Sequence, residues 1–119
     1  MNPNRKLSEI AEVEFSDVVE FAEDLEEKLR IYIRDGSYID AWFSRKIKGR
    51  YAYHWERRHL DGTVYRHDNI PHKKWRSVET FPKHFHNGSE YDVCDSSISD
   101  EPADAIREFL SFVQQVTNE

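Results

Sequence analysis

The sequence lacks most of the features that place a protein in a membrane or in an oxidising compartment. It has one cysteine among 119 residues, so an intrachain disulfide and a cysteine-rich zinc site are both excluded. No apolar run approaches the roughly 18 residues that cross a bilayer. The N-terminus, MNPNRKLSEI, has no hydrophobic signal core. These absences predict a cytoplasmic protein with no membrane partner.

Glycine and proline are also scarce, with four of each, whereas aromatic residues make up 13% of the chain. Disordered chains are poor in aromatic residues, so a folded protein is expected. A chain of this length has the size of one domain. We therefore expect residues 1–119 to form a single domain.

The net charge of −6 hides three blocks of opposite sign. Residues 1–27 hold nine acidic and two basic residues, and residues 87–119 hold eight acidic and one basic. Residues 28–86 hold fourteen basic residues, six acidic residues and all six histidines. This asymmetry favours a polyanionic or acidic partner for the middle block. Alternatively, the acidic flanks fold back and neutralise a basic sheet.

Alternating apolar residues around two turn signals predict antiparallel strands. Asp35-Gly36 separates one pair of alternating runs, and Asp61-Gly62 separates a second pair. In the first pair, one face is apolar and the other interleaves arginine with aromatic rings. Consecutive strands with short turns pair as neighbours, so a four-stranded meander is expected, with a fifth short strand at Glu90–Val93.

Both ends of the chain favour helices. At the C-terminus, Ser99 or Asp100 is the expected N-cap and Pro102 lies in the first turn. The apolar stripe of this helix consists of Ile106, Phe109, Leu110, Val113 and Val116. The N-terminal stretch fits edge strands as well, but a helix within Leu7–Glu27 is preferred. The predicted fold class is α+β, an antiparallel sheet of four to five strands with a C-terminal and an N-terminal helix packed on it.

The histidines all lie between positions 54 and 86, and the segment TFPKHFHNG (80–88) places two of them one residue apart. Prolines and glycine after Asn69 predict a long irregular loop, which usually has a function. Imidazole suits proton transfer near neutral pH, so the candidate catalytic residues are His72, His84 and His86, with Asp68 to orient an imidazole. Candidate phosphate and nucleic-acid contacts are Arg66, Lys73, Lys83, Asn69, Arg30 and Arg34.

A metal site is the rival interpretation of the same residues. His84-x-His86 presents two imidazoles on one face, and His72 or Asp68 would complete a three-ligand site. Standard zinc spacing is missing, and the neighbouring Lys83 disfavours a cation. A third interpretation makes the segment a polar turn without chemistry.

Four ordered pieces of the sequence resemble the TumE family: YAYHWERR (51–58), GTVYRHDNIPHKKW (62–75), TFPKHFH (80–86) and GSEYDV (88–93). The resemblance covers about Arg30 to Val93. It implies a small toxin of a prokaryotic type II toxin–antitoxin pair that acts on RNA, with a DNA-binding antitoxin as partner. The matching positions are His54, Trp55, Arg66, Asp68, Asn69, Pro71, His72, Thr80, Phe81, Pro82, His84 and His86. Many relatives have histidine where this chain has Lys73 and Lys83.

Three hypotheses follow from the residues and the resemblance. The first is a toxin that cleaves RNA as a metal-independent endoribonuclease through histidine acid–base chemistry, with no cofactor. The second is a non-enzymatic nucleic-acid-binding module, and the third is a metal-dependent hydrolase with a His-x-His site. The expected partners are RNA and the antitoxin, and a homo-oligomer is left open.

Overall fold

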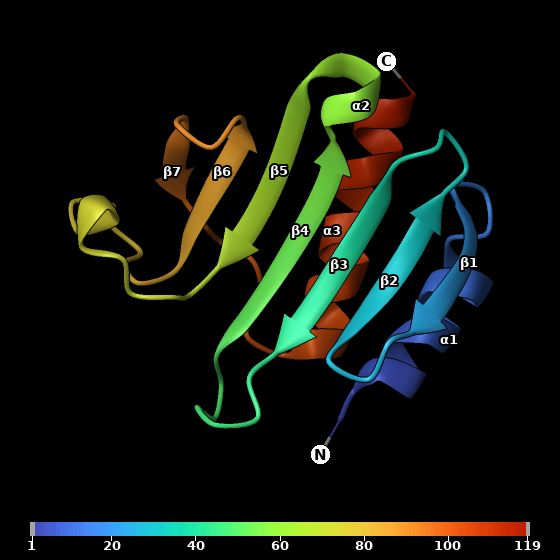
Figure 1. Cartoon of the computed structure of the whole chain (residues 1–119), viewed down its shortest axis with the longest axis horizontal. Coiled ribbons are helices and arrows are strands. Elements are labelled where there is room, and N and C mark those ends of the chain that lie inside the picture. Colours follow the sequence, from blue (N-terminus) through green and yellow to red (C-terminus); the bar gives the residue numbers. More distant parts are fainter. Residues whose placement is uncertain (1, 119) are drawn as a thin grey trace.

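Seven antiparallel strands follow one another in chain order across one sheet in the computed structural model, which describes residues 2–118 (Figure 1). The strands are β1 (Val19–Asp24), β2 (Lys28–Ile33), β3 (Tyr38–Phe43), β4 (Tyr51–Arg57), β5 (Thr63–Asp68), β6 (His84–Gly88) and β7 (Val93–Asp95). The helices are α1 (Asn4–Glu14), the single turn α2 (Arg58–Asp61) and α3 (Pro102–Thr117), with a 3₁₀ turn, η1, at Lys73–Trp75. The predicted α+β class and the C-terminal helix are confirmed.

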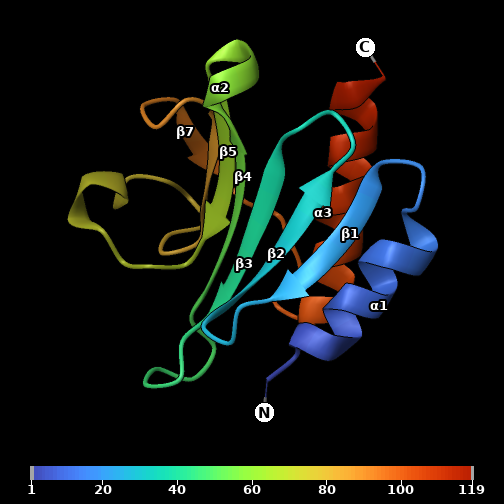
Figure 2. The same ribbon diagram turned by 45° about the vertical axis from the view of Figure 1, so that its right-hand side comes forward.

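The helices α1 and α3 cover one face of the sheet and leave the other face open. Figure 2 shows both helices on one side and the segment that carries η1 on the opposite side. Alternation along β2, β3 and β4 places the apolar residues toward the helices, as predicted. The fully buried core includes Leu29, Ile31, Ile39, Trp55, Ile106, Leu110 and Val113.

The sheet has seven strands, so the prediction of four to five was wrong. One extra strand comes from the N-terminal stretch, where α1 ends at Glu14 and β1 begins at Val19. This stretch therefore contains both the preferred helix and the alternative edge strand, one after the other. The other is β6, which lies inside the predicted loop. Its alternation consists of histidines and one phenylalanine, so apolar periodicity did not reveal it.

Two boundaries, the start of the last strand and the N-cap expected at Ser99 or Asp100, also differ from the predictions. The expected strand at Glu90–Val93 is wrong, because β7 begins at Val93 and the preceding residues form the turn from β6, in which Asn87 donates to the Asp92 carbonyl. Helix α3 has Glu101 as its N-cap, because the Glu101 carboxylate accepts from the Ala103 N–H at 3.4 Å.

The two Asp-Gly turns are wider than a two-residue hairpin turn. Residues 34–37 join β2 to β3, and only Gly36 among them has a positive φ, of 96°. Helix α2 lies between β4 and β5 and ends at Gly62, whose φ of 79° suits the left-handed C-cap.

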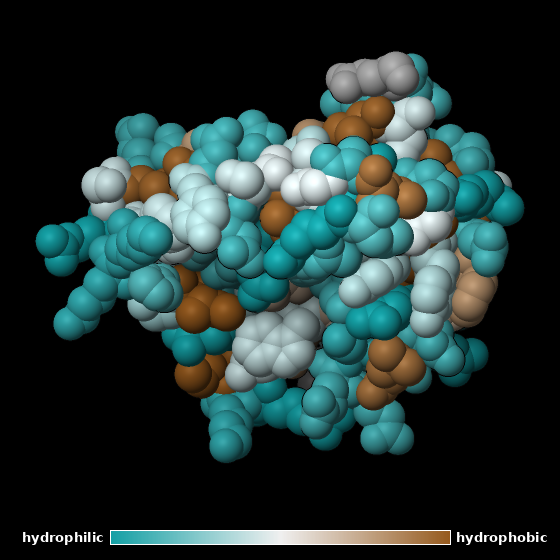
Figure 3. Space-filling model, turned by 45° about the horizontal axis from the view of Figure 1, so that its top comes forward, coloured by the Kyte–Doolittle hydropathy of each residue, from teal (hydrophilic) through white to brown (hydrophobic). Residues whose placement is uncertain are grey.

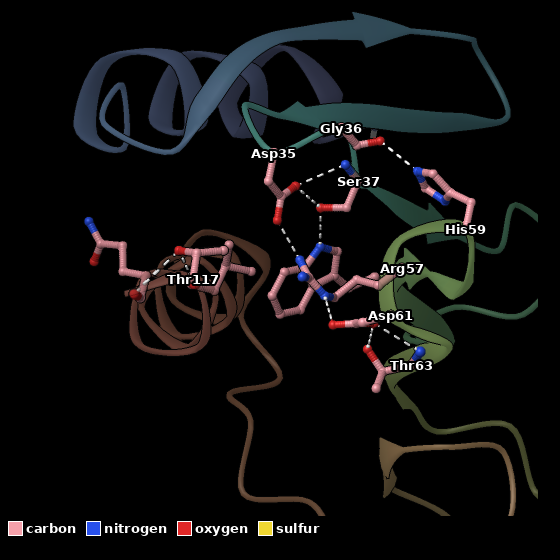
Figure 4. A network of polar contacts seen from close by, with 11 residues as sticks. Asp35, Gly36, Ser37, Arg57, His59, Asp61, Thr63 and Thr117 are labelled. Carbon is pink, nitrogen blue, oxygen red and sulfur yellow. Dashed lines mark hydrogen bonds and ion pairs between the residues drawn. The ribbon is translucent and has the colours of Figure 1, made fainter. Parts of the chain in front are cut away.

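A polar network ties the first hairpin to α2 (Figure 4). The buried Trp55 indole donates to the Ser37 hydroxyl at 2.8 Å, and this hydroxyl donates in turn to Asp35. Arg57 lies between the carboxylates of Asp35 and Asp61 and pairs with both. The network therefore gives the buried indole a partner and fixes the hairpin end of the sheet.

The surface is mostly hydrophilic, and the view in Figure 3 shows only scattered apolar side chains on that face. The large apolar side chains that are exposed between residues 2 and 118 are Val13, Phe21, Leu25, Ile47, Leu60 and Tyr91. None of the helices in this range is long and apolar enough to cross a membrane.

Candidate functional site

Strand register brings charged and imidazole side chains into two rows on the open face of the sheet. In the first row Arg30 pairs with Asp40, Asp40 with His54, His54 with Arg66, and Arg66 with His86. In the second row Asp68 pairs with His84. Directly opposed residues on antiparallel strands have Cβ atoms about 5 Å apart, so these side chains are neighbours.

Residues 69–83, the cleft segment, pass across the open face and form a wall over these rows. Between this segment and the sheet lies a cleft of about 480 Å³, the histidine cleft. Its lining includes His54, Arg66, Asp68, His72, Lys74, Trp75, His84, His86 and Tyr91. The structure thus brings together five predicted site residues: Arg66, Asp68, His72, His84 and His86.

The floor of the histidine cleft is a buried polar cluster. Asp68 is 4% exposed and His84 is 2% exposed. One Asp68 oxygen accepts from Arg66 Nε at 2.8 Å, and the other accepts from the Ile70 N–H at 2.9 Å. His84 Nε2 lies 3.4 Å from that second oxygen. Buried charges persist only when they are paired, and the contacts with Arg66 and the Ile70 N–H pair the Asp68 carboxylate.

Backbone contacts fix the tautomers of the neutral imidazoles. His84 Nδ1 donates to the Pro82 carbonyl at 2.7 Å, and His86 Nδ1 donates to the Glu90 carbonyl at 3.1 Å. Each of these rings therefore has a lone pair at Nε2 when neutral. His72 has the opposite tautomer, because its Nδ1 accepts from the Lys74 N–H at 3.2 Å.

On the sheet side of the cleft, β4 contributes His54. Its Nδ1 lies 3.4 Å from Arg66 Nη1 and its Nε2 lies 3.1 Å from the Glu56 carboxylate. Burial lowers the pKa of His54, and burial also lowers the pKa of His86. Both rings therefore favour the neutral form.

Trp75 closes the cleft above the histidines. Its ring centroid lies 5.7 Å from that of His86, 6.3 Å from that of His84 and 6.4 Å from that of His72. The Lys74 ammonium lies 5.0 Å from the Trp75 centroid and 5.7 Å from the Tyr91 centroid. An aromatic ring beside a cation suits a nucleotide base next to its phosphate.

Several predicted contacts lie outside the cleft. Lys83 is 3.4 Å from Asp100, and the Asn69 amide accepts from the Tyr51 N–H and donates to the Gly49 carbonyl, each at 2.8 Å. Lys73 lies in η1 and does not line the cleft. Arg30 pairs with Asp40 and covers Tyr38, and Arg34 donates to the Ser16 carbonyl at 2.9 Å.

The loop position predicted for His84 and His86 was also wrong, because both belong to β6. Sequence reasoning did not assign Lys74, Trp75, Tyr91 or His54 to the site. The HKKW run at 72–75 carried a signal for the first two, since it places an aromatic residue among cations and beside a candidate histidine. No local pattern shows that His54 meets Arg66, because strand register creates that contact.

The cluster has the donor atoms of a metal site as well. Asp68, His84 and His86 each offer one ligand atom, and these atoms lie within 4.8 Å of one another. The two histidines outside the cleft, His59 and His67, differ in environment: His67 faces α3 and stacks on Phe85 at 4.1 Å.

A comparison with protein families gives one result that covers nearly the whole chain. The model of the family described as Toxin TumE matches residues 4–117. The match includes α1 and α3, which lie outside the segment from Arg30 to Val93 that carried the resemblance. No curated protein and no solved structure matches the chain.

Proposed function

Because the chain belongs to the TumE toxin family, we propose that it is a toxin that cleaves RNA in the histidine cleft without a metal ion. His86 is the general base and His72 is the general acid. Arg66 and Lys74 hold the phosphate, and Trp75 stacks on a base. His84 and Asp68 position these groups from the floor of the cleft.

Two histidines that line one cleft carry this proposal. The Nε2 lone pair of His86 takes the proton of a ribose 2′-hydroxyl. His72 acts in its imidazolium form, in which Nδ1 no longer accepts from the Lys74 N–H, and its Nε2–H protonates the leaving 5′-oxygen. The 2′-oxygen attacks phosphorus and the bond to the 5′-oxygen breaks. The products are a 2′,3′-cyclic phosphate and a 5′-hydroxyl, and one proton has been taken and one returned.

The cations and the buried carboxylate support the same chemistry. Negative charge grows on the phosphate oxygens during attack, and a guanidinium stabilises it when it is held in place beforehand. Arg66 is held by Asp68 at 2.8 Å and approached by His54 at 3.4 Å, so its orientation is fixed on two sides. Lys74 lies on the opposite wall, beside Trp75.

Membership in a toxin family implies an antitoxin partner. We propose that the antitoxin covers the histidine cleft, at least in part, since an open cleft would leave the toxin active. Acidic side chains of the antitoxin would complement Lys74 and the exposed Lys73 and would mainly speed association.

Three alanine variants test the proposal. His86→Ala and His72→Ala should each lower RNA cleavage by about 10²–10⁴-fold and relieve growth arrest on expression, while the fold persists. His59→Ala is the matched control, because this histidine lies on α2, outside the cleft, and contacts the Gly36 carbonyl. Binding of RNA without cleavage by the unmodified chain would instead favour a binding module, and full activity in both cleft variants would contradict the proposal.

A further inference from the structure

We infer that Asp68, His84 and His86 bind one divalent transition-metal ion of the Zn²⁺ class, and that this ion inhibits the cleavage reaction. The binding half of the inference depends on the cleft geometry alone. The inhibitory half rests on the proposed function, because the ion would occupy the lone pair that His86 uses as a base.

The ligand atoms come from two paired strands whose register is fixed. His84 lies directly opposite Asp68 on β5, and His86 is on the same side of β6. The three donor atoms lie within 4.8 Å of one another, whereas ligands on a tetrahedral zinc ion are about 3.3 Å apart. His86 is the least buried of the three ligands, so its side-chain rotation is the expected route by which this difference closes.

The two imidazoles are already oriented as metal ligands usually are. A ligating histidine almost always donates its other ring N–H to a carbonyl or carboxylate, which fixes the tautomer. His84 donates to the Pro82 carbonyl and His86 to the Glu90 carbonyl, so each directs a free Nε2. Arg66 holds one oxygen of Asp68, and the other oxygen, which accepts from the Ile70 N–H, keeps a second lone pair for an ion.

The contact between His84 and Asp68 is stable only if a positive charge lies between the two side chains. In the tautomer set by Pro82, the Nε2 lone pair of His84 faces a carboxylate oxygen at 3.4 Å in a buried site. Two electron pairs in that arrangement repel each other unless a cation lies between them. A bound metal ion supplies this charge, and a proton on Nε2 is the competing source.

The donor set selects the class of ion. Two imidazole nitrogens and one carboxylate oxygen suit Zn²⁺, Co²⁺ or Fe²⁺, whereas Mg²⁺ and Ca²⁺ prefer oxygen ligands. All three residues line the cleft, so further coordination positions are accessible to water or to phosphate. The ion is therefore expected to bind where the RNA phosphate would.

Titration of the metal-free chain with Co²⁺, followed by visible absorption and calorimetry, tests the site. We expect one ion per chain, displaced by Zn²⁺, and a loss of at least tenfold in affinity in both His86→Ala and Asp68→Asn. His59→Ala should bind as the unmodified chain does, and thermal unfolding of each variant shows that the fold persists. Unchanged Co²⁺ binding in both cleft variants, or no stoichiometric binding, overturns the inference. The positive charge between His84 and Asp68 would then be a proton on His84 Nε2.

A second arm separates this inference from the proposed function. RNA cleavage should fall as Zn²⁺ is added over the concentration range in which it binds, and a chelator should restore it. If Zn²⁺ instead stimulates RNA cleavage, both the inhibitory role of the ion and the metal-independent mechanism are overturned, but the metal site itself is upheld. No cleavage with or without metal, combined with stoichiometric Co²⁺ binding, would refute the proposed function and the inhibitory half while upholding the site.

Discussion

Removal of the charge at Asp68 should weaken the fold by an amount that the contacts determine. Asp68→Asn preserves the size of the side chain and an oxygen that accepts from the Ile70 N–H. It loses the charged hydrogen bond from Arg66 at 2.8 Å, a type of contact that contributes ~1.5–3 kcal/mol. The Arg66 side chain is 32% exposed, so water offsets part of this loss and about 2 kcal/mol is expected.

Urea unfolding followed by circular dichroism measures this effect. The midpoint for Asp68→Asn should fall by roughly 1 M with an unchanged slope. Asp100→Asn is the matched control, because this carboxylate is 80% exposed at 3.4 Å from Lys83 and its loss should cost less than about 0.5 kcal/mol. Equal midpoints for the two variants would refute the claim that the cleft floor is a tightly paired cluster.

Ser37→Ala should lower the free energy of unfolding by ~1–3 kcal/mol in the same assay, because the buried Trp55 indole loses its acceptor; an unchanged midpoint would contradict this. Lys74→Ala should reduce the salt dependence of RNA binding, measured by fluorescence anisotropy, more than Arg34→Ala does, since only Lys74 lines the cleft. Trp75→Ala should weaken binding of single-stranded RNA by about 1–3 kcal/mol at any salt concentration, and equal affinity would argue against stacking. The antitoxin should slow hydrogen exchange in the cleft segment, whereas unchanged exchange there would indicate control from another surface.

The sequence predicted the central strands because their period is unambiguous. Leu29 and Ile31 on β2 alternate with arginine and tyrosine, and both lie fully buried on the face predicted to be apolar. The α3 stripe is equally clear, since Ile106, Leu110 and Val113 are fully buried. In these elements local pattern and tertiary packing agree.

The site was harder to predict because the register of the paired strands, and not a local sequence pattern, brings its residues together. His84 and His86 are separated from Arg66 by the whole cleft segment, and the pairing of β5 with β6 brings them together. Lysines 73 and 83 looked equivalent to Lys74 in the sequence, but the turn at η1 directs only Lys74 into the cleft. Charge counts identified the basic block, yet the pair Arg30–Asp40 shows that part of it is neutralised within the sheet.

The most direct test of the account is the chemical nature of the ends left on cleaved RNA. A defined single-stranded RNA is incubated with metal-free protein in excess chelator, and the products are analysed by mass spectrometry. We predict a 2′,3′-cyclic phosphate on one fragment and a 5′-hydroxyl on the other, and about 10²–10⁴-fold less product with His86→Ala. A 3′-hydroxyl and a 5′-phosphate that appear only when a divalent metal is added would contradict the account.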